Sequence, residues 1–422
     1  MAKRTGLFRA LTFIMALLLA VSSVAGVMLE RFRQQVDETL GTTSQKVVST
    51  GEGTLWTAFT PPQELRNEDG TLNAHATIQH FIDFSRELSA GGTVLLKNNG
   101  VLPLQKGISV SLLGMKSYYP ILASGQGMPI VGSIITLEDA LSKNRTDFRN
   151  ARRNVQRNNI KPSFKKLDDY DFEGAEMKIN PVPFEAYEGY SKEFSGWGRF
   201  TYIPSMQSFN DDISKHFDDP SLETIEKYAP SFMDSLHEYN DAAIVVVGRP
   251  SSENGDYAVG GVYEGQGNTE PLELTTNERE IIRVATENFD KVVVLVNCVN
   301  AIEIAELQNN DKIDAILWIA HPGSFGILGV ADVLVGNVSP SGGLPDTYAA
   351  KNLSAPAMVN FGDYKFTNFN TDGSADTSVT RVNSHSYVVE AESIYVGYRY
   401  YETRYNDIVY GLGNADSKTG VF

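Results

Sequence analysis

The sequence of 422 residues contains one cysteine, three tryptophans and six histidines. A single cysteine excludes an internal disulfide, and the position of Cys298 in an apolar run over residues 292–299 predicts a buried thiol rather than a reactive one. The histidines show no spacing typical of metal ligands, so we expect no metal site. The glycine-rich stretch 123–127 lacks the spacing of a nucleotide-binding loop, and we expect no cofactor.

Basic residues are also few. There are 36 lysines and arginines against 52 acidic residues, which gives a net charge of −16. Three of the basic residues lie near the N-terminus (Lys3, Arg4 and Arg9), so that residues 30–422 carry 33 basic and 52 acidic side chains, a net charge of −19. Such an acidic surface repels phosphate backbones, and nucleic acid is therefore not an expected partner. Neutral ligands such as sugars are compatible with it.

One long uncharged run lies at residues 10–29, between the three basic residues and Glu30. Its twenty residues are enough for a helix that crosses a bilayer, and the basic residues before it favour a cytoplasmic N-terminus. We therefore expect a transmembrane helix within residues 1–29 that anchors the chain in the membrane on the extracytoplasmic face. Ser23-Val24-Ala25 also fits a cleavage site, so a cleaved signal peptide and secretion are the alternative.

The remaining chain divides by composition. Residues 30–74 are polar and are predicted to be a linker, and residues 75–350 are predicted to form the main domain. Within that domain, residues 144–240 are charged and aromatic and are interpreted as an insertion, helical around Leu222–Tyr239. Residues 351–422 are predicted to be an extension with a tyrosine-rich strand at Ile394–Tyr401.

The main domain alternates between apolar runs and helical patterns. Three runs of buried-strand type lie at Ala242–Val247, Val292–Val296 and Ile313–Ile319. Helices are expected between and after them, one of them opened by the capping-box spacing of Thr275 and Glu278. This alternation predicts an α/β fold, a mainly parallel sheet with helices on both faces. Such sheets bind ligands outside the carboxyl ends of their strands, so we expect the site in the loops that follow these runs.

A further helix is expected to begin near Asn73. Its apolar residues Ile78, Phe81, Ile82 and Leu88 fall on one face at helical spacing.

Several stretches, in this order, resemble the second domain of family 3 glycoside hydrolases. They are Gly92–Leu104 (GTVLLKNNGVLPL), Ile135–Leu141 (ITLEDAL), His321–Ser324 (HPGS), Asn337–Thr347 (NVSPSGGLPDT) and Tyr395–Glu402 (YVGYRYYE). The resemblance covers most of residues 75–402 and implies a flavodoxin-like α/β sandwich. It also implies a retaining β-glucosidase or β-xylosidase whose substrate is an oligosaccharide or β-glucoside. The arrangement is similar to members in which the sandwich domain precedes the (β/α)₈ barrel.

The family's nucleophile is an aspartate on that barrel, in a short motif in which the aspartate precedes a tryptophan. No tryptophan of this sequence follows an aspartate. We therefore expect that the chain is truncated before the barrel, which a separate chain could supply, and that it is inactive alone.

The loop at Ser251–Tyr257 (SSENGDY) follows the run Ala242–Val247 and resembles the family's Ser-Gly-Glu-Gly-Tyr-Asp-Arg loop. The resemblance assigns the general acid/base to Glu253 and a substrate contact to Asp256, although Tyr257 replaces the usual arginine. Glycoside hydrolysis needs such a carboxylic acid to protonate the leaving oxygen. Arg249 is a candidate for binding a sugar hydroxyl, with a structural ion pair as its alternative, and Glu264 is the reserve acid.

Two functions remain open from the sequence. The first is the acid-bearing part of a retaining glycosidase. The second is a non-catalytic carbohydrate-binding or scaffolding module at the cell surface.

Overall fold

The structure is a computed structural model that describes residues 12–24, 26, 62–122, 135–142, 174–193, 219–249, 270–361, 364–365 and 386–410. The chain divides into two units, Met1–Gln63 and Glu64–Phe422. In the first unit residues 12–24 are helical and their apolar side chains are exposed. None of the helices in the described part of the chain is both long and apolar enough to cross a membrane, so the transmembrane helix predicted within residues 1–29 is not among them.

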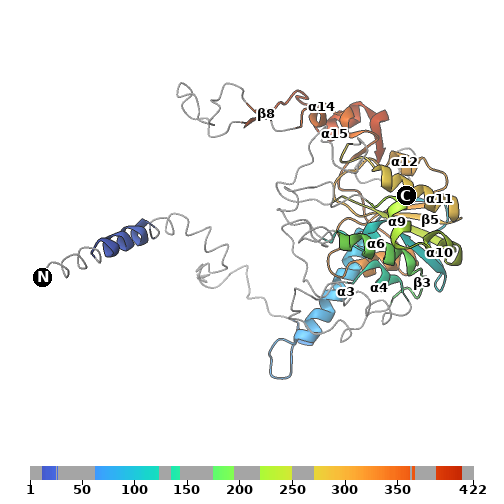
Figure 1. The fold of residues 1–422 in the computed structure, drawn as a ribbon, viewed down its shortest axis with the longest axis horizontal. Coiled ribbons are helices and arrows are strands. Elements are labelled where there is room, and N and C mark those ends of the chain that lie inside the picture. Colours follow the sequence, from blue (N-terminus) through green and yellow to red (C-terminus); the bar gives the residue numbers. More distant parts are fainter. Residues whose placement is uncertain are drawn as a thin grey trace, which may run out of the picture. The chain divides into compact units, whose positions relative to one another are not determined.

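The second unit is built on a six-stranded sheet (Figure 1). The strand order is β1-β6-β5-β4-β2-β3. Four neighbouring pairs are parallel, and β1 at one edge is antiparallel to β6. The strands are β1 (Val94–Asn98), β2 (Ser109–Leu113), β3 (Lys178–Ile179), β4 (Ala242–Val247), β5 (Val292–Val296) and β6 (Ala315–Trp318).

The five parallel strands have the flavodoxin-like order. Numbered along the chain, they lie in the sheet as 2-1-3-4-5, because β3 lies on one side of β2 and β4 on the other. The chain direction across the sheet therefore reverses between β2 and β4. The prediction of a mainly parallel α/β sheet is confirmed.

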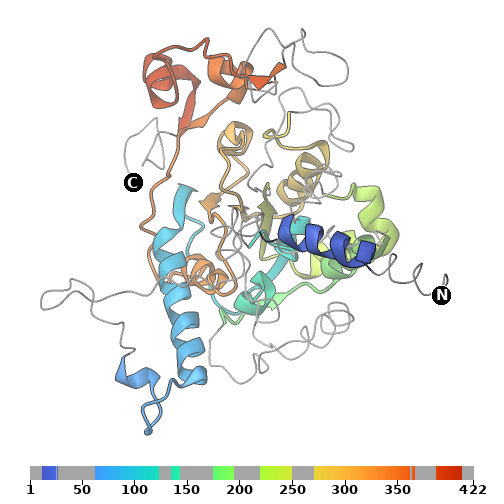
Figure 2. The same ribbon diagram turned by 90° about the vertical axis from the view of Figure 1, so that its left-hand side faces the viewer.

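Helices cover both faces of this sheet, since every residue of β4, β5 and β6 is buried. One group of helices comprises α3 (Ala74–Gly92), α4 (Leu137–Leu141) and α13 (Ile327–Leu334). In this group α13 contacts both other helices, and α3 runs along α13 (Figure 2). A second group comprises α6 (Val182–Glu193), α9 (Leu222–Tyr228), α10 (Phe232–Glu238) and α11 (Thr276–Asn288). The short helix α12 (Ala305–Gln308) lies between β5 and β6 in the chain.

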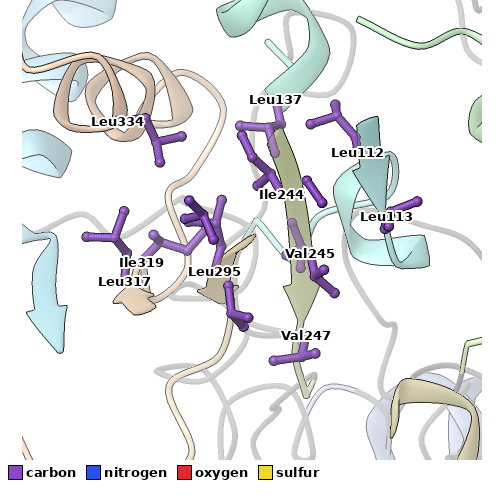
Figure 3. Close-up of a cluster of buried hydrophobic side chains, with 14 of the residues drawn as sticks. Leu112, Leu113, Leu137, Ile244, Val245, Val247, Leu295, Leu317, Ile319 and Leu334 are labelled. Carbon is purple, nitrogen blue, oxygen red and sulfur yellow. The ribbon is translucent and has the colours of Figure 1, made fainter. Parts of the chain in front are cut away.

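The core lies on either side of the central strands. Figure 3 shows the aliphatic side chains of β2, β4, β5 and β6, with Leu137 of α4 and Leu334 of α13 from the covering helices. The unbroken aliphatic runs of β4 (AAIVVV) and β5 (VVVLV) suit strands that are buried on both faces. Cys298 is buried as predicted.

Three expectations about the fold need correction. The helix α3 begins directly after its N-cap Asn73, close to the predicted start, but the apolar face that its residues share is not buried as a whole. Ile82 is fully buried, whereas Phe81 is 47% and Leu88 64% exposed. The three residues differ in exposure because only the side of α3 that packs on α13 is covered by the domain. The second correction concerns the predicted insertion 144–240: its described parts supply β3, α6, α9 and α10, whose apolar side chains belong to the main core.

The third correction concerns the tyrosine-rich segment Ile394–Tyr401. It is not a strand: turns lead to Gly397, which has a φ of 58°, and α15 (Tyr398–Thr403) follows. Alternating aromatic and β-branched residues form a strand only where a neighbouring strand pairs with them and one of their faces is buried. Here Ile394, Tyr395 and Val396 are exposed, and only Tyr401 is buried.

Residues 348–410 add small elements beside the sheet. The strands β7 (Tyr348–Ala349) and β10 (Ile408–Tyr410) pair antiparallel, as do β8 (Tyr364–Lys365) and β9 (Ser386–Tyr387). The short helix α14 (Pro356–Val359) lies between β7 and β8 in the chain. A separate apolar cluster forms here from Ala349, Ala355 and Tyr401.

Candidate functional site

The carboxyl ends of the parallel strands meet at one edge of the sheet, and the switch between β2 and β4 lies there. The chain leaves β2 at Gly114, β4 at Gly248, β5 at Asn297 and β6 at Ile319. Ligands of flavodoxin-like sheets bind outside this edge, where the loops on either side of the switch point separate. The loops singled out from the sequence are therefore brought together by the fold.

Two glycines allow the loops at this edge to approach closely. Gly114 has a φ of +82°, and a Cβ on it would lie 2.6 Å from the carbonyl oxygen of Val246. A Cβ on Gly248 would lie 2.3 Å from the carbonyl oxygen of Asn297. Neither position accepts a side chain without moving the backbone of the next strand.

A buried tyrosine and aspartate hold the loop after β2. The Gly114 amide donates to the hydroxyl oxygen of Tyr187 at 2.8 Å, and the Met115 amide donates to the carboxylate of Asp219. Burial, and then the charge of Asp219, raises the pKa of the Tyr187 phenol well above its ordinary range. The phenol therefore stays protonated. Sequence reasoning missed both residues, because no local pattern links positions so far apart in the chain.

Arg249, the first side chain after β4 and Gly248, lies in a buried ion pair. Nη1 and Nη2 donate to the two carboxylate oxygens of Glu278 at 2.6 and 2.7 Å. Nε donates to the carbonyl of Pro271 at 2.8 Å, while Nη1 and Nη2 also donate to the carbonyls of Gly248 at 2.9 Å and Glu273 at 2.5 Å. A guanidinium has five N–H groups, and five acceptors surround this one.

The structure thus gives Arg249 the ion pair that was its alternative role. With both side chains fully buried and every guanidinium donor taken, Arg249 has no donor left for a sugar hydroxyl. The prediction that Arg249 binds substrate therefore does not agree with the structure. The guanidinium is surrounded instead by acceptors of α11 and of residues 271–273.

Two side chains from the ends of the neighbouring strands lie close to Arg249. They are Cys298, just after β5, and His321, after β6. Burial raises the pKa of Cys298 to about 12 and lowers the pKa of His321 to about 4. Both side chains are therefore neutral at pH 7, so Cys298 is not a thiolate and His321 is not a cation there.

Asn297 joins three of the loops at this edge. Its amide nitrogen donates to the carbonyls of Ile121 at 3.0 Å and Ala320 at 2.6 Å, and its amide oxygen accepts from the Ile121 backbone at 2.7 Å. Because Asn297 is fully buried, these bonds satisfy its amide and tie the segments after β2, β5 and β6 together.

The predicted acid Glu253, the predicted substrate contact Asp256 and the reserve acid Glu264 all lie outside the described residues. The segment that carries them, residues 250–269, leaves the sheet at Arg249 and returns at Glu270. Its starting point is therefore the carboxyl end of β4, beside the switch point. No cluster of three or more metal-ligating side chains is found within the described ranges.

Known proteins resemble this chain over most of the same region. The chain is 27% identical over 345 residues to a β-glucosidase of Ruminococcus albus and 26% identical over 341 residues to β-glucosidase A of Butyrivibrio fibrisolvens. These alignments cover 79% and 77% of this chain, but the chain spans only 28% and 33% of the two curated relatives.

Solved structures share the fold. A β-glucosidase from Paenibacillus barengoltzii superposes with a TM-score of 0.52 at 24% identity, over 78% of this chain and 28% of that one. β-Glucosidase 3B from Thermotoga neapolitana, in complex with glucose, superposes with a TM-score of 0.51 at 22% identity, over 81% of this chain and 39% of that one. At these identities the likeness establishes the fold alone.

The model of the glycosyl hydrolase family 3 C-terminal domain matches residues 93–398, which include the whole sheet and the loops at its carboxyl edge. The predicted resemblance is thereby confirmed, and this chain belongs to glycosyl hydrolase family 3, of which it carries the C-terminal domain.

Proposed function

We propose that this chain is the part of a retaining β-glucosidase that carries the general acid/base, Glu253. Membership of the family and two curated relatives named β-glucosidase support the glycosidase. Because the chain spans a third or less of those relatives, we assign the nucleophile to a (β/α)₈ barrel outside this sequence. The substrate is a β-glucoside or β-xyloside, and no cofactor takes part.

The observation that carries the proposal is the position of Arg249 at the carboxyl end of β4. Glu253 follows four residues later, on the segment that starts beside the switch point. A carboxyl group there would lose part of its hydration when a sugar docks, and desolvation raises the pKa of a carboxylic acid. A raised pKa keeps the proton available near neutral pH, as a general acid requires. Asp256, three residues further on, would accept hydrogen bonds from sugar hydroxyls.

The proposed reaction has two steps. Glu253 donates its proton to the glycosidic oxygen while the barrel carboxylate attacks the anomeric carbon, so that the C–O bond breaks and a glycosyl-enzyme forms. Glu253, now ionised, then takes a proton from a water molecule that displaces the nucleophile. One carboxyl group serves as acid and base in turn.

The proposal is tested first on the chain alone. An acid without a nucleophile cannot form the covalent intermediate, so the purified chain should not hydrolyse an aryl β-glucoside. Turnover above about 1 s⁻¹, which is in the ordinary range of enzymes, would show that the chain contains a complete site.

The role of Glu253 is tested with a family 3 barrel supplied by fusion or co-expression. Glu253→Gln should slow hydrolysis of glucosides with poor leaving groups by about 10²–10⁴-fold, the usual contribution of a positioned acid. Activated aryl glucosides need little protonation and should slow much less. Glu264→Gln, on the same segment, is the matched control and should leave both rates near wild type. If the two variants exchanged these effects, the assignment would pass to Glu264.

We also propose that the enzyme works outside the cytoplasm, on the extracytoplasmic face of a membrane or secreted from it. Support comes from the uncharged run at residues 10–29 and the basic residues before it. A phosphatase reporter that is active only after export, fused after residue 74, should be active. A fusion that lacks residues 1–29 should not be, and equal activity of both would count against export.

A further inference from the structure

The two ends of the segment 250–269 are joined by one side chain. Arg249 immediately precedes the segment, and its guanidinium donates to the carbonyl oxygens of Pro271 at 2.8 Å and Glu273 at 2.5 Å, just beyond its other end. The segment of 20 residues therefore leaves and rejoins the domain at a single buried point. No other described residue hydrogen-bonds to both of these carbonyls.

Glu278 fixes the guanidinium in the orientation that this contact needs. Its two carboxylate oxygens accept from both terminal nitrogens of Arg249, and one of them also accepts from the Thr275 amide at 2.8 Å. The same carboxylate thus completes the capping box of α11 and receives the arginine. Its orientation is set by the helix, so the helix sets the orientation of Arg249.

We propose that Arg249 and Glu278 are positioning residues for the general acid. By joining the ends of the segment at a point fixed to β4 and α11, the pair limits where Glu253 can lie relative to the bound glycoside. Proton transfer requires the acid to be within hydrogen-bond reach of the leaving oxygen, and a displacement of about 1 Å can cost two orders of magnitude in rate. This inference rests on the proposed role of Glu253.

Arg249→Lys tests the geometry of the pair while keeping its charge. A lysine ammonium is a single point donor, so it cannot contact both oxygens of Glu278 and also both carbonyls beyond the segment. The matched control is Arg86→Lys. Arg86 also makes a two-point contact with a carboxylate, through Nε and Nη2 to Asp332 at 2.5 and 2.6 Å, but it joins α3 to α13 away from the segment.

Hydrogen exchange on the full chain measures the anchoring without any requirement for activity. Arg249→Lys should raise the exchange rate of amides at residues 270–275 by about tenfold or more, while amides of β4 and β5 stay within about twofold of wild type. Arg86→Lys should leave residues 270–275 unchanged. Unchanged exchange there in Arg249→Lys would overturn the inference, and so would a uniform rise over the whole sheet, because that is loss of the fold rather than of an anchor.

The catalytic part is measured with the barrel restored. Arg249→Lys should lower kcat/KM for a poor leaving group by about 10–100-fold and for an activated aryl glucoside by less than about threefold. Equal losses on both substrates would make the pair structural and overturn its positioning role. If Glu253→Gln has no effect, the assignment of the acid fails, and with it the positioning role; the anchoring of the segment ends is still decided by hydrogen exchange.

Discussion

Two arginine–glutamate pairs involve neighbouring residues of α11, and they differ strongly in burial. Arg249–Glu278 is a two-point contact at 2.6 and 2.7 Å with both side chains 0% exposed. Arg279, the next residue along the helix, contacts Glu306 at 2.7 Å, but these side chains are 37% and 44% exposed. Water can replace the partner in the second pair and cannot in the first.

The difference shows that the contact distance alone does not determine the importance of an ion pair. In the buried pair, loss of either residue leaves a buried charge without its counter-ion, whereas in the exposed pair the remaining charge is solvated. Variants that remove one partner should therefore separate the two pairs widely in free energy of unfolding. Each of the following predictions sharpens this contrast or contradicts it.

The largest effect is expected for Arg249→Met. It should lower the free energy of unfolding by about 3–5 kcal/mol, because Glu278 would remain buried with an unpaired charge. Urea denaturation followed by circular dichroism measures the loss. The double variant Arg249→Met/Glu278→Gln removes that charge and should be more stable than Arg249→Met alone. A double variant that is less stable than either single one would mean that the unpaired charge is not the cause.

The second prediction concerns His321, a partly buried side chain after β6. Burial lowers its pKa from 6.5 to about 4, so the unfolded chain binds a proton at a higher pH than the folded chain does. The associated stability is complete above pH 6.5 and is lost as pH falls from 6.5 through about 4. The loss is about 3 kcal/mol, at about 1.4 kcal/mol for each pH unit.

Urea denaturation at pH 7, 5.5 and 4 tests this dependence. His321→Gln cannot take up the proton and should lose less stability than the wild type between pH 7 and pH 4. Parallel losses in the two proteins would show that carboxylates elsewhere, and not His321, cause the acid sensitivity.

The same contrast between buried and exposed positions explains what the sequence could predict. The bounds of β4 and β5 were predicted residue for residue, because unbroken apolar runs leave a strand buried on both faces as the simplest solution. Exposed or half-buried elements were predicted less well. Phe81 lies on the apolar face predicted for α3 yet is exposed, and Ile394–Tyr401 was predicted to be a strand but is not one. An apolar pattern does not show whether another element covers it.

Only part of the candidate site could be predicted from the sequence. Local patterns predicted the edge of the sheet, the loop after β4 and the capping box of Thr275 and Glu278. The pairing of Arg249 with Glu278 did not, since both an ion pair and a sugar contact fit an arginine at a strand end. Only the folded positions of residues 29 apart in the chain decide between them.

A third prediction uses a pair of intermediate burial. Arg86 and Asp332 are 27% and 8% exposed, so Arg86→Met should cost about 2 kcal/mol, between the buried and the exposed pairs. Denaturation in urea under the conditions used for Arg249→Met gives the comparison. A loss as large as that of Arg249→Met would mean that the two-point contact, rather than burial, sets the effect.

The smallest effect is expected for Arg279→Met, at about 0–1 kcal/mol. The contacts of Arg279 with Glu306 raise its pKa, but both side chains of the pair are more than one-third exposed, and water screens the attraction. Salt separates this pair from the buried one: between 0.05 and 1 M NaCl the cost of Arg279→Met should shrink toward zero, while that of Arg249→Met should hardly change. Glu306→Gln is the matched control, because it removes the same contact from the other side and should cost as little. A salt-independent loss above about 2 kcal/mol in Arg279→Met would show that its aliphatic stem or its contact with Glu273 at 3.8 Å matters more than the exposed ion pair.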